Sequence, residues 1–194
     1  MMSRVWGKAG LGKFFLLFGL TLLFGLGERT GAQNSLPMHL LTVLNDQYYV
    51  TFAVLPVILF FCAGEMEDDT PLALVRYGTY GRYFFHKWLA LSVIAALFWL
   101  GQMAALLLSG IGLPIAGSWV EAAGGQWQEV FLLLQGYFPS LWAAILGCAG
   151  QMLLGYCLIV LTSLFLGHFC SRSMAVKLLM VLYLFAALWI KQPV

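Results

Sequence analysis

The sequence predicts an all-α integral membrane protein, a bundle of five or six transmembrane helices in one domain that covers residues 1–194. Three observations predict this class. The chain is 62% hydrophobic and 9% charged, whereas soluble domains are roughly 25% charged. Its mean hydropathy is +0.90. Long apolar runs alternate with short segments that hold most of the charges, as expected where helices of about 20 residues cross a bilayer.

Five apolar runs have the length and composition of membrane spans. They cover residues 11–27, 48–64, 88–110, 141–168 and 174–190. Lys13 lies in the first run and Lys177 in the last, and both can extend their ammonium groups to the membrane surface. Pro56 predicts a kink in the second run, which neighbouring helices can accommodate.

The segments between these runs are expected at the membrane surfaces. Residues 35–45 predict an interfacial helix that leads into the second span. Residues 113–138 predict an extracytoplasmic loop, and Gly136 and Pro139 separate its end from the fourth span. A sixth span would have to come from this divided region.

The positive charges predict an orientation. If the N-terminus is cytoplasmic, then of the ten Lys and Arg residues only Arg29 and Lys191 lie outside. This bias predicts a multi-pass protein of the plasma or inner membrane with residues 65–87 in the cytoplasm, and an odd number of spans places the C-terminus outside. The net charge of +2 gives no support for nucleic-acid binding.

The segment 65–87 is the most highly charged part of the chain. Its acidic residues, Glu65, Glu67, Asp68 and Asp69, come first. Pro71 and a predicted short helix follow, and the basic residues come last, which suits the helix dipole. An ordinary basic membrane flank explains residues 82–88 equally well, but not the separate helix before them.

Metal and catalytic sites are disfavoured. Three of the acids are consecutive, and His86 is separated from them by the predicted helix, so a solvated acidic loop is the better interpretation. The four cysteines have no CxxC spacing and are expected to be small buried residues. We therefore predict no catalytic, cofactor-binding or metal-binding residue, and no enzyme activity in this chain.

Small and polar residues recur at helical spacing within the third and fourth spans. They include Gln102, Ser109, Gly147, Gln151 and Gly155. Such residues allow helices to approach closely and form hydrogen bonds between them. Helix packing is the favoured interpretation, and lining of a transport path is the alternative.

The residues from Asn45-Asp-Gln-Tyr-Tyr49 to Lys87-Trp88 resemble the small permease subunits of bacterial ABC-2-type exporters. The similarity includes Leu55-Pro56, the acidic cluster and Leu-Val-Arg76-Tyr-Gly-Thr-Tyr-Gly-Arg82. It covers roughly residues 45–102, and the rest of the chain only by topology. In that family the segment between the second and third spans forms a coupling helix, which docks on a separate cytoplasmic ATPase.

The resemblance therefore implies that ATP and magnesium bind to the partner ATPase and that this chain binds no cofactor. It also implies a set of residues that contact the ATPase: Leu72, Leu74, Val75, Arg76, Tyr77 and Arg82. The chain departs from the family in one respect. The family usually has six spans and a cytoplasmic C-terminus, whereas five spans and an outside C-terminus are predicted here.

Two functions from different classes follow. The first is a permease subunit that pairs with a second copy or a homologue, forms half of a path, and exports a peptide or another hydrophobic compound. The alternative is a non-transporting immunity or assembly factor that binds a partner through residues 65–87. An intramembrane enzyme is disfavoured, since no two groups of catalytic type are expected to face each other in the bilayer.

Overall fold

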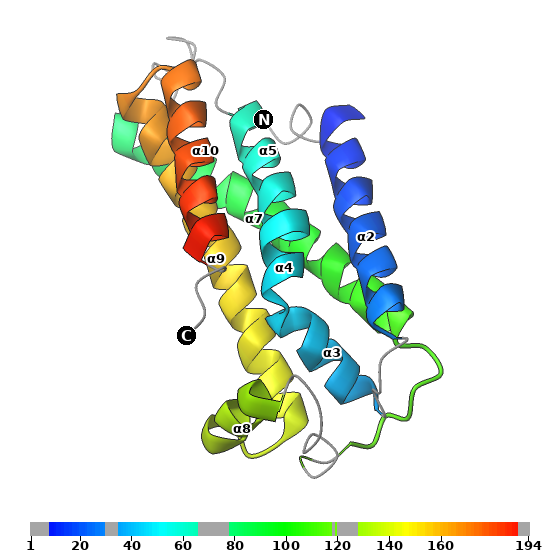
Figure 1. Ribbon diagram of the computed structural model, residues 1–194. Coiled ribbons are helices and arrows are strands. Elements are labelled where there is room, and N and C mark those ends of the chain that lie inside the picture. Colours follow the sequence, from blue (N-terminus) through cyan, green and yellow to red (C-terminus); the bar gives the residue numbers. More distant parts are fainter. Residues whose placement is uncertain (1–7, 30–34, 66–77, 118, 120–127, 190–194) are drawn as a thin grey trace.

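The computed structural model describes residues 8–29, 35–65, 78–117, 119 and 128–189, and the regular structure in these ranges is entirely helical (Figure 1). The helices are α2 (Lys8–Glu28), α3 (Leu36–Asn45), α4 (Gln47–Tyr49), the π-helical turn η1 (Val50–Val54), α5 (Leu55–Glu65), α7 (Tyr80–Ser109), α8 (Gln128–Tyr137), α9 (Leu141–Phe169) and α10 (Arg172–Trp189). The predicted all-α class is confirmed.

Four stretches of helix in the described residues are long and apolar enough to cross a membrane. They are Gly10–Glu28, Gln47–Glu65, Tyr80–Ser109 and Leu141–Phe169. These four correspond to the first four predicted spans. The structure thus supports an integral membrane protein with four such helices, which is fewer than the five or six that we predicted.

The fifth predicted span, residues 174–190, lies mostly in α10, which has 18 residues but is not among the four. Arg172 and Lys177 occupy its first turns, and its uncharged part after Lys177 is only about 18 Å long. The hydrocarbon core is about 30 Å thick. Within residues 113–138, α8 has 10 residues, about half of a span, and so supplies no sixth span among the described residues.

The bundle is organised around α7, which crosses behind α4 and α5 in Figure 1 and packs against both α2 and α9. Gly101 permits the contact with α2, because a Cβ atom there would lie 2.5 Å from Cε2 of Phe14. The ring of Phe14 packs edge-on against Phe98, with 5.7 Å between the ring centroids. Buried apolar side chains from α2, α3, α5, α7 and α9 form one continuous core.

A π-helical turn joins α4 to α5 where the sequence predicts a kink. The backbone N–H of Leu55 donates to the carbonyl of Val50, five residues earlier. Pro56 follows directly, and its ring would clash with the carbonyl four residues before it in a regular helix. The wider turn explains how the helix continues past Pro56. At the start of α4, the backbone N–H of Tyr49 donates to Oδ1 of Asp46 over 2.8 Å. The side chain of Tyr49 is buried.

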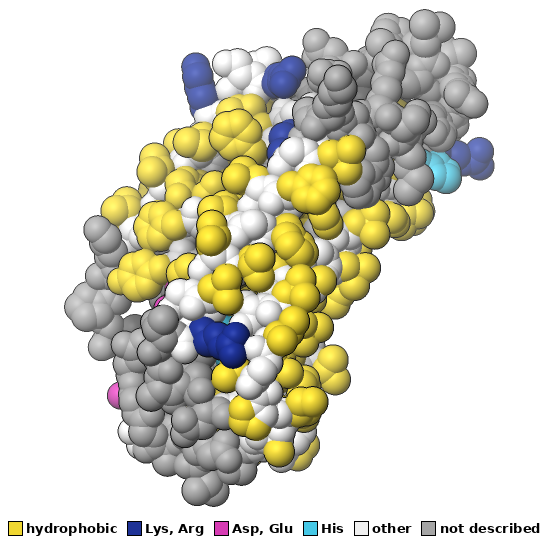
Figure 2. Space-filling view, turned by 90° about the vertical axis from the view of Figure 1, so that its right-hand side faces the viewer, with side chains coloured by type: hydrophobic (Ala, Val, Ile, Leu, Met, Phe, Trp, Pro, Cys, Tyr) yellow, Lys and Arg dark blue, Asp and Glu magenta, His cyan; other side chains and the backbone are white. Residues whose placement is uncertain are grey.

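The outer surface of the bundle is apolar. Hydrophobic side chains cover much of the face in Figure 2, and basic side chains lie mainly near its upper end. Many large apolar residues are exposed, among them Phe60, Leu146 and Phe185. A soluble monomer rarely exposes so much contiguous apolar surface, so this surface suits contact with lipid or with another membrane protein.

Candidate functional site

A chain of hydrogen bonds connects four helices in the middle of the bundle. The Nε2 atom of Gln102 in α7 donates to the hydroxyl of Tyr49 in α4 over 2.8 Å. On its other side, the hydroxyl of Tyr156 in α9 donates to Oε1 of Gln102. The hydroxyl of Tyr49 also pairs with Oγ1 of Thr21 in α2 over 2.6 Å. We call Thr21, Tyr49, Gln102 and Tyr156 the polar chain.

All four side chains of the polar chain are almost completely buried. The amide of Gln102 is fixed in orientation, because its nitrogen faces one tyrosine and its oxygen faces the other. The ring of Phe24 stacks on that of Tyr49, with 4.9 Å between centroids. Since the described groups bond to one another, the polar chain is suited to hold helices together rather than to line an aqueous path.

Sequence reasoning identified Gln102 but missed its three partners. Thr21 and Tyr156 are isolated polar residues within apolar runs, whereas Tyr49 follows a polar stretch at the start of the second predicted span. The available signal was the depth of Tyr156, since tyrosines in membrane helices usually lie at the interfaces. Tyr156 lies at the centre of the fourth predicted span, so a hydrogen-bond partner inside the bundle could have been expected.

A second polar contact lies at Ser109, the last residue of α7. Nε2 of His39 in α3 and Oγ of Ser109 are 2.8 Å apart, and Ser109 also donates to the carbonyl of Leu106 over 2.7 Å. His39 is fully buried. Burial, and secondarily the positive charge of Arg29, lowers the pKa of His39. His39 is thus held in its neutral form, which suits a hydrogen bond that fixes α3 against α7.

The remaining small and polar residues predicted in α9 have different surroundings. A Cβ atom on Gly147 would lie 2.6 Å from Cζ of Phe138, so this glycine permits close packing within the chain. Gln151 is exposed on the outside of the bundle. A Cβ atom on Gly155 would meet no atom within 4 Å. The structure therefore does not bring Gln151 and Gly155 to the polar chain.

Most of the predicted ATPase-binding residues lie outside the described residues: Leu72, Leu74, Val75, Arg76 and Tyr77. Arg82 is described and lies in the first turn of α7, which begins at Tyr80, earlier than the predicted start of the third span. Gly78 precedes the helix with a φ of +71°, a left-handed conformation that suits glycine. The ring of Tyr80 packs against that of His168, with centroids 4.2 Å apart.

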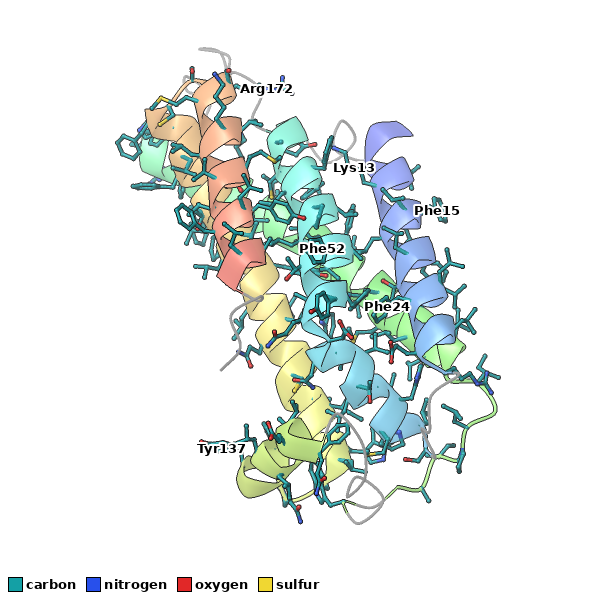
Figure 3. All side chains as sticks on the ribbon, viewed as in Figure 1. Lys13, Phe15, Phe24, Phe52, Tyr137 and Arg172 are labelled. Carbon is teal, nitrogen blue, oxygen red and sulfur yellow. The ribbon has the colours of Figure 1, made fainter. Side chains whose placement is uncertain are left out.

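Basic residues gather at this end of the bundle. Figure 3 shows Lys13 and Arg172 at the end opposite to Tyr137. The Nζ atom of Lys13 donates to the carbonyl of Phe60 over 3.1 Å, near the C-terminal end of α5. A cation there is favoured by the helix dipole. α5 ends at Glu65 and α7 begins at Tyr80, both at the end of the bundle that carries these charges.

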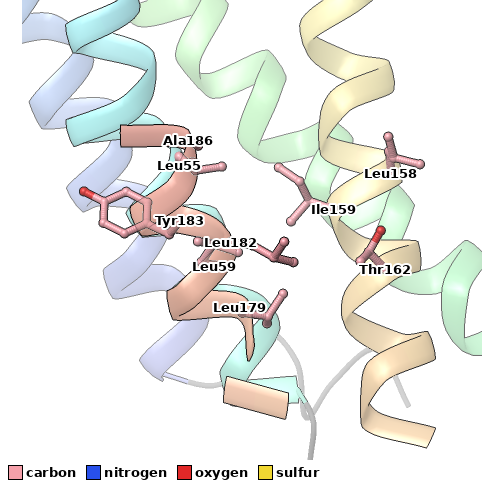
Figure 4. Close-up of a pocket in the computed structure, with 9 residues that line it drawn as sticks. All are labelled: Leu55, Leu59, Leu158, Ile159, Thr162, Leu179, Leu182, Tyr183 and Ala186. Carbon is pink, nitrogen blue, oxygen red and sulfur yellow. The ribbon is translucent and has the colours of Figure 1, made fainter. Parts of the chain in front are cut away.

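Two apolar cavities flank α10. One has a volume of 390 Å³ and lies between α5 and α10, where Pro56, Phe60 and Met180 are among its lining residues. The other has a volume of 250 Å³ and is also lined by α9 (Figure 4). Among the side chains of α10 whose burial is described, only Ala175 and Leu179 are buried. This helix is therefore the least firmly packed of the long helices.

No cluster of three or more potential metal ligands occurs among the described residues. Cys62, Cys148, Cys157 and Cys170 are free thiols.

Comparison with known proteins gave no relative: no family model, no curated protein and no solved structure matches the chain.

Proposed function

We propose that this chain is the membrane-spanning subunit of an ATP-driven exporter of the ABC-2 type, which couples to a separate cytoplasmic ATPase. One observation carries the proposal. α5 ends and α7 begins, on either side of the charged segment in the sequence, at the end of the bundle where Lys13, Arg82 and Arg172 lie. By the positive-inside rule this end is cytoplasmic, in a plasma or inner membrane. A soluble ATPase can reach the segment there.

The cavity between α5 and α10 supports an export role. Its lining is apolar, it lies at the surface of the bundle, and α10 has few buried residues that would hold it in one position. The interior, by contrast, is closed by the polar chain. A path for a peptide or another hydrophobic compound is therefore expected between this subunit and a second copy or homologue, along α5 and α10, rather than through the bundle.

Co-purification tests the coupling. Leu74→Ala combined with Arg76→Ala should release an ATP-binding protein that accompanies the wild-type chain, since these residues are proposed to contact it. The matched control combines Leu132→Ala with Glu129→Ala in α8, at the other end of the bundle. This variant should retain the partner. The proposal fails if no ATP-binding protein accompanies the wild type and the solubilised complex hydrolyses no ATP.

The second candidate is an immunity or assembly factor that binds a partner through the same segment without transport. The well-filled interior, with its few polar groups engaged in hydrogen bonds, is compatible with it. Purified complex in sealed vesicles separates the two functions. ATP-dependent movement of a hydrophobic peptide across the vesicle membrane supports the exporter, whereas partner binding without movement supports the alternative.

A further inference from the structure

Gln151 places an amide on the outer face of α9, within the hydrocarbon depth of a spanning helix. α9 has 29 residues, about 43 Å, and the hydrocarbon core is about 30 Å thick. Gln151 lies about 15 Å from the start of α9 and about 27 Å from its end. Centred in the membrane, α9 would therefore hold this side chain well inside the core.

The amide of Gln151 has no hydrogen-bond partner in the described part of the chain, and it is exposed. A polar group in hydrocarbon without a partner is unfavourable by several kcal/mol. Gln is also shorter than the Lys and Arg side chains that reach the membrane surface from such depths. The membrane-embedded protein is thus expected to bring a hydrogen-bonding group from elsewhere to Gln151.

The surroundings of Gln151 permit another helix to approach closely. A Cβ atom on Gly150 or on Gly155 would meet nothing within 4 Å. Leu154 and Leu158 lie on the same side and are 72% and 62% exposed. We call Gly150, Gln151, Leu154, Gly155 and Leu158 the α9 outer face.

The other side of α9 is already occupied by the chain itself. Trp99 of α7 donates through Nε1 to the carbonyl of Ala149 over 2.9 Å, and Tyr156 belongs to the polar chain. Gly147, one turn before Gln151 on the same side of α9, is covered by Phe138 of the same chain, so the open part of that side begins after it. Among the described residues of α9, the outer face is the part that combines an unpaired amide with open glycines.

We propose that the α9 outer face binds the same face of a second copy of this chain. An amide both donates and accepts, so two copies of Gln151 related by a two-fold axis complement each other. Lipid acyl chains cannot satisfy either group. Copies inserted with the same orientation are parallel, which allows both amides to meet at one depth. The inference deepens the proposed function, on which it rests for the pairing of two subunits. Leu158 also lines the smaller cavity between α5, α9 and α10, so this interface adjoins the proposed path.

Energy transfer between two populations of the full chain tests the interface. Chains that carry donor or acceptor fluorescent proteins at the N-terminus are reconstituted together in phosphatidylcholine vesicles, and the protein-to-lipid ratio is varied. Wild type should associate. Gln151→Leu should raise the apparent dissociation constant about tenfold, the scale of a strong interhelical hydrogen bond. Gln151→Asn should retain most of the association.

Steric variants provide a matched comparison. Gly155→Ile should also weaken association, because the side chain keeps the two helices apart. Gly19→Ile in α2 is the control, since a Cβ atom there likewise meets nothing within 4 Å, and it should associate as wild type does. A monomeric wild type, or a Gln151→Leu variant that associates equally well, overturns the inference.

The readout is independent of the ATPase. If copies of the chain associate in vesicles but no ATP-binding protein accompanies the chain in the co-purification, the proposed function fails and this interface remains. A monomeric chain that still binds and stimulates an ATPase would do the reverse.

Discussion

Gln102 is hydrogen-bonded through both ends of its amide within the polar chain. Its two amide ends connect Tyr49 of α4 with Tyr156 of α9, and Tyr49 extends the connection to α2 through Thr21. In a lipid environment there is no water to replace these bonds. Loss of this amide removes one hydrogen-bond partner from each of two buried hydroxyls. Leaving a buried polar group without a partner costs more free energy than a typical hydrogen bond contributes to stability.

We therefore expect Gln102→Leu to lower the free energy of unfolding by about 1–3 kcal/mol. Titration with SDS in mixed micelles measures this change. Gln135→Leu in α8 is the matched control, because Gln135 is exposed, and it should leave the free energy of unfolding unchanged. Combining Gln102→Leu with Tyr156→Phe should recover part of the loss, since one orphaned hydroxyl is removed. Equal effects of both Gln variants would contradict the assigned role.

His39 predicts a pH dependence. Its pKa is lowered in the folded protein, so the unfolded chain binds a proton more readily. The contribution of His39 to the free energy of unfolding is then fully present above the unfolded-state pKa of about 6.5, and it declines as the pH falls below that value. Unfolding measured between pH 8 and pH 5.5 should show this decline in wild type and in His168→Gln, which retains His39. His39→Gln should show a flatter profile. An unchanged profile in His39→Gln would assign the decline to other groups.

Helices α2 and α7 are held together by a close approach at a glycine. Phe14 lies over Gly101, where a Cβ atom would already be 2.5 Å from its ring. Small residues at such crossings permit the dispersion contacts that stabilise helix pairs in membranes. Gly101 and Ser109 lie two turns apart on one face of α7. Gly101 faces Phe14 of α2, and Ser109 lies against Gly25 of α2 as well as His39 of α3.

Gly101→Val should lower the free energy of unfolding by about 1–3 kcal/mol, because the added side chain overpacks the crossing with Phe14. SDS titration again provides the measurement. Gly19→Val serves as the comparison, since α2 has open space there, and its effect should stay within about 0.5 kcal/mol. If both variants behave alike, the effect belongs to helix propensity and not to the crossing.

On the scale of the whole molecule, the charges define two ends of the bundle. Arg82 lies in the first turn of α7 at one end, while Ile115 follows α7 at the other. The proposed orientation places the first end in the cytoplasm. The four native cysteines do not form disulfides, so single-cysteine variants can be made after each is replaced by alanine.

Labelling with a membrane-impermeant maleimide tests this orientation. Ile115→Cys, at a position that is 68% exposed, should react in intact cells. Arg82→Cys should react only after the membrane is permeabilised. The reversed pattern would show the opposite orientation and would remove the proposed contact with a cytoplasmic ATPase, whereas reaction of both in intact cells would show that α7 does not cross the membrane.

The sequence alone could predict the helical class and the positions of four long apolar helices, because burial of the backbone in lipid depends on composition and length more than on neighbours. It also predicted a helix close to the bounds of α10, but whether α10 crosses the membrane stays a prediction. Arg172 and Lys177 shorten its uncharged part, and whether snorkelling compensates depends on the helices around it. The π-helical turn was also beyond reach, since Pro56 predicts a distortion but not its form.

At the candidate site, the sequence identified which residues are polar at membrane depth, and the tertiary structure decided what each one contacts. Gln102 and Gln151 look equivalent in sequence, each an amide in an apolar helix with small residues nearby. The rotation of each helix about its axis decides the difference: Gln102 faces two tyrosines, and Gln151 faces outward. That rotation is set by packing between residues far apart in the chain, which no local pattern encodes.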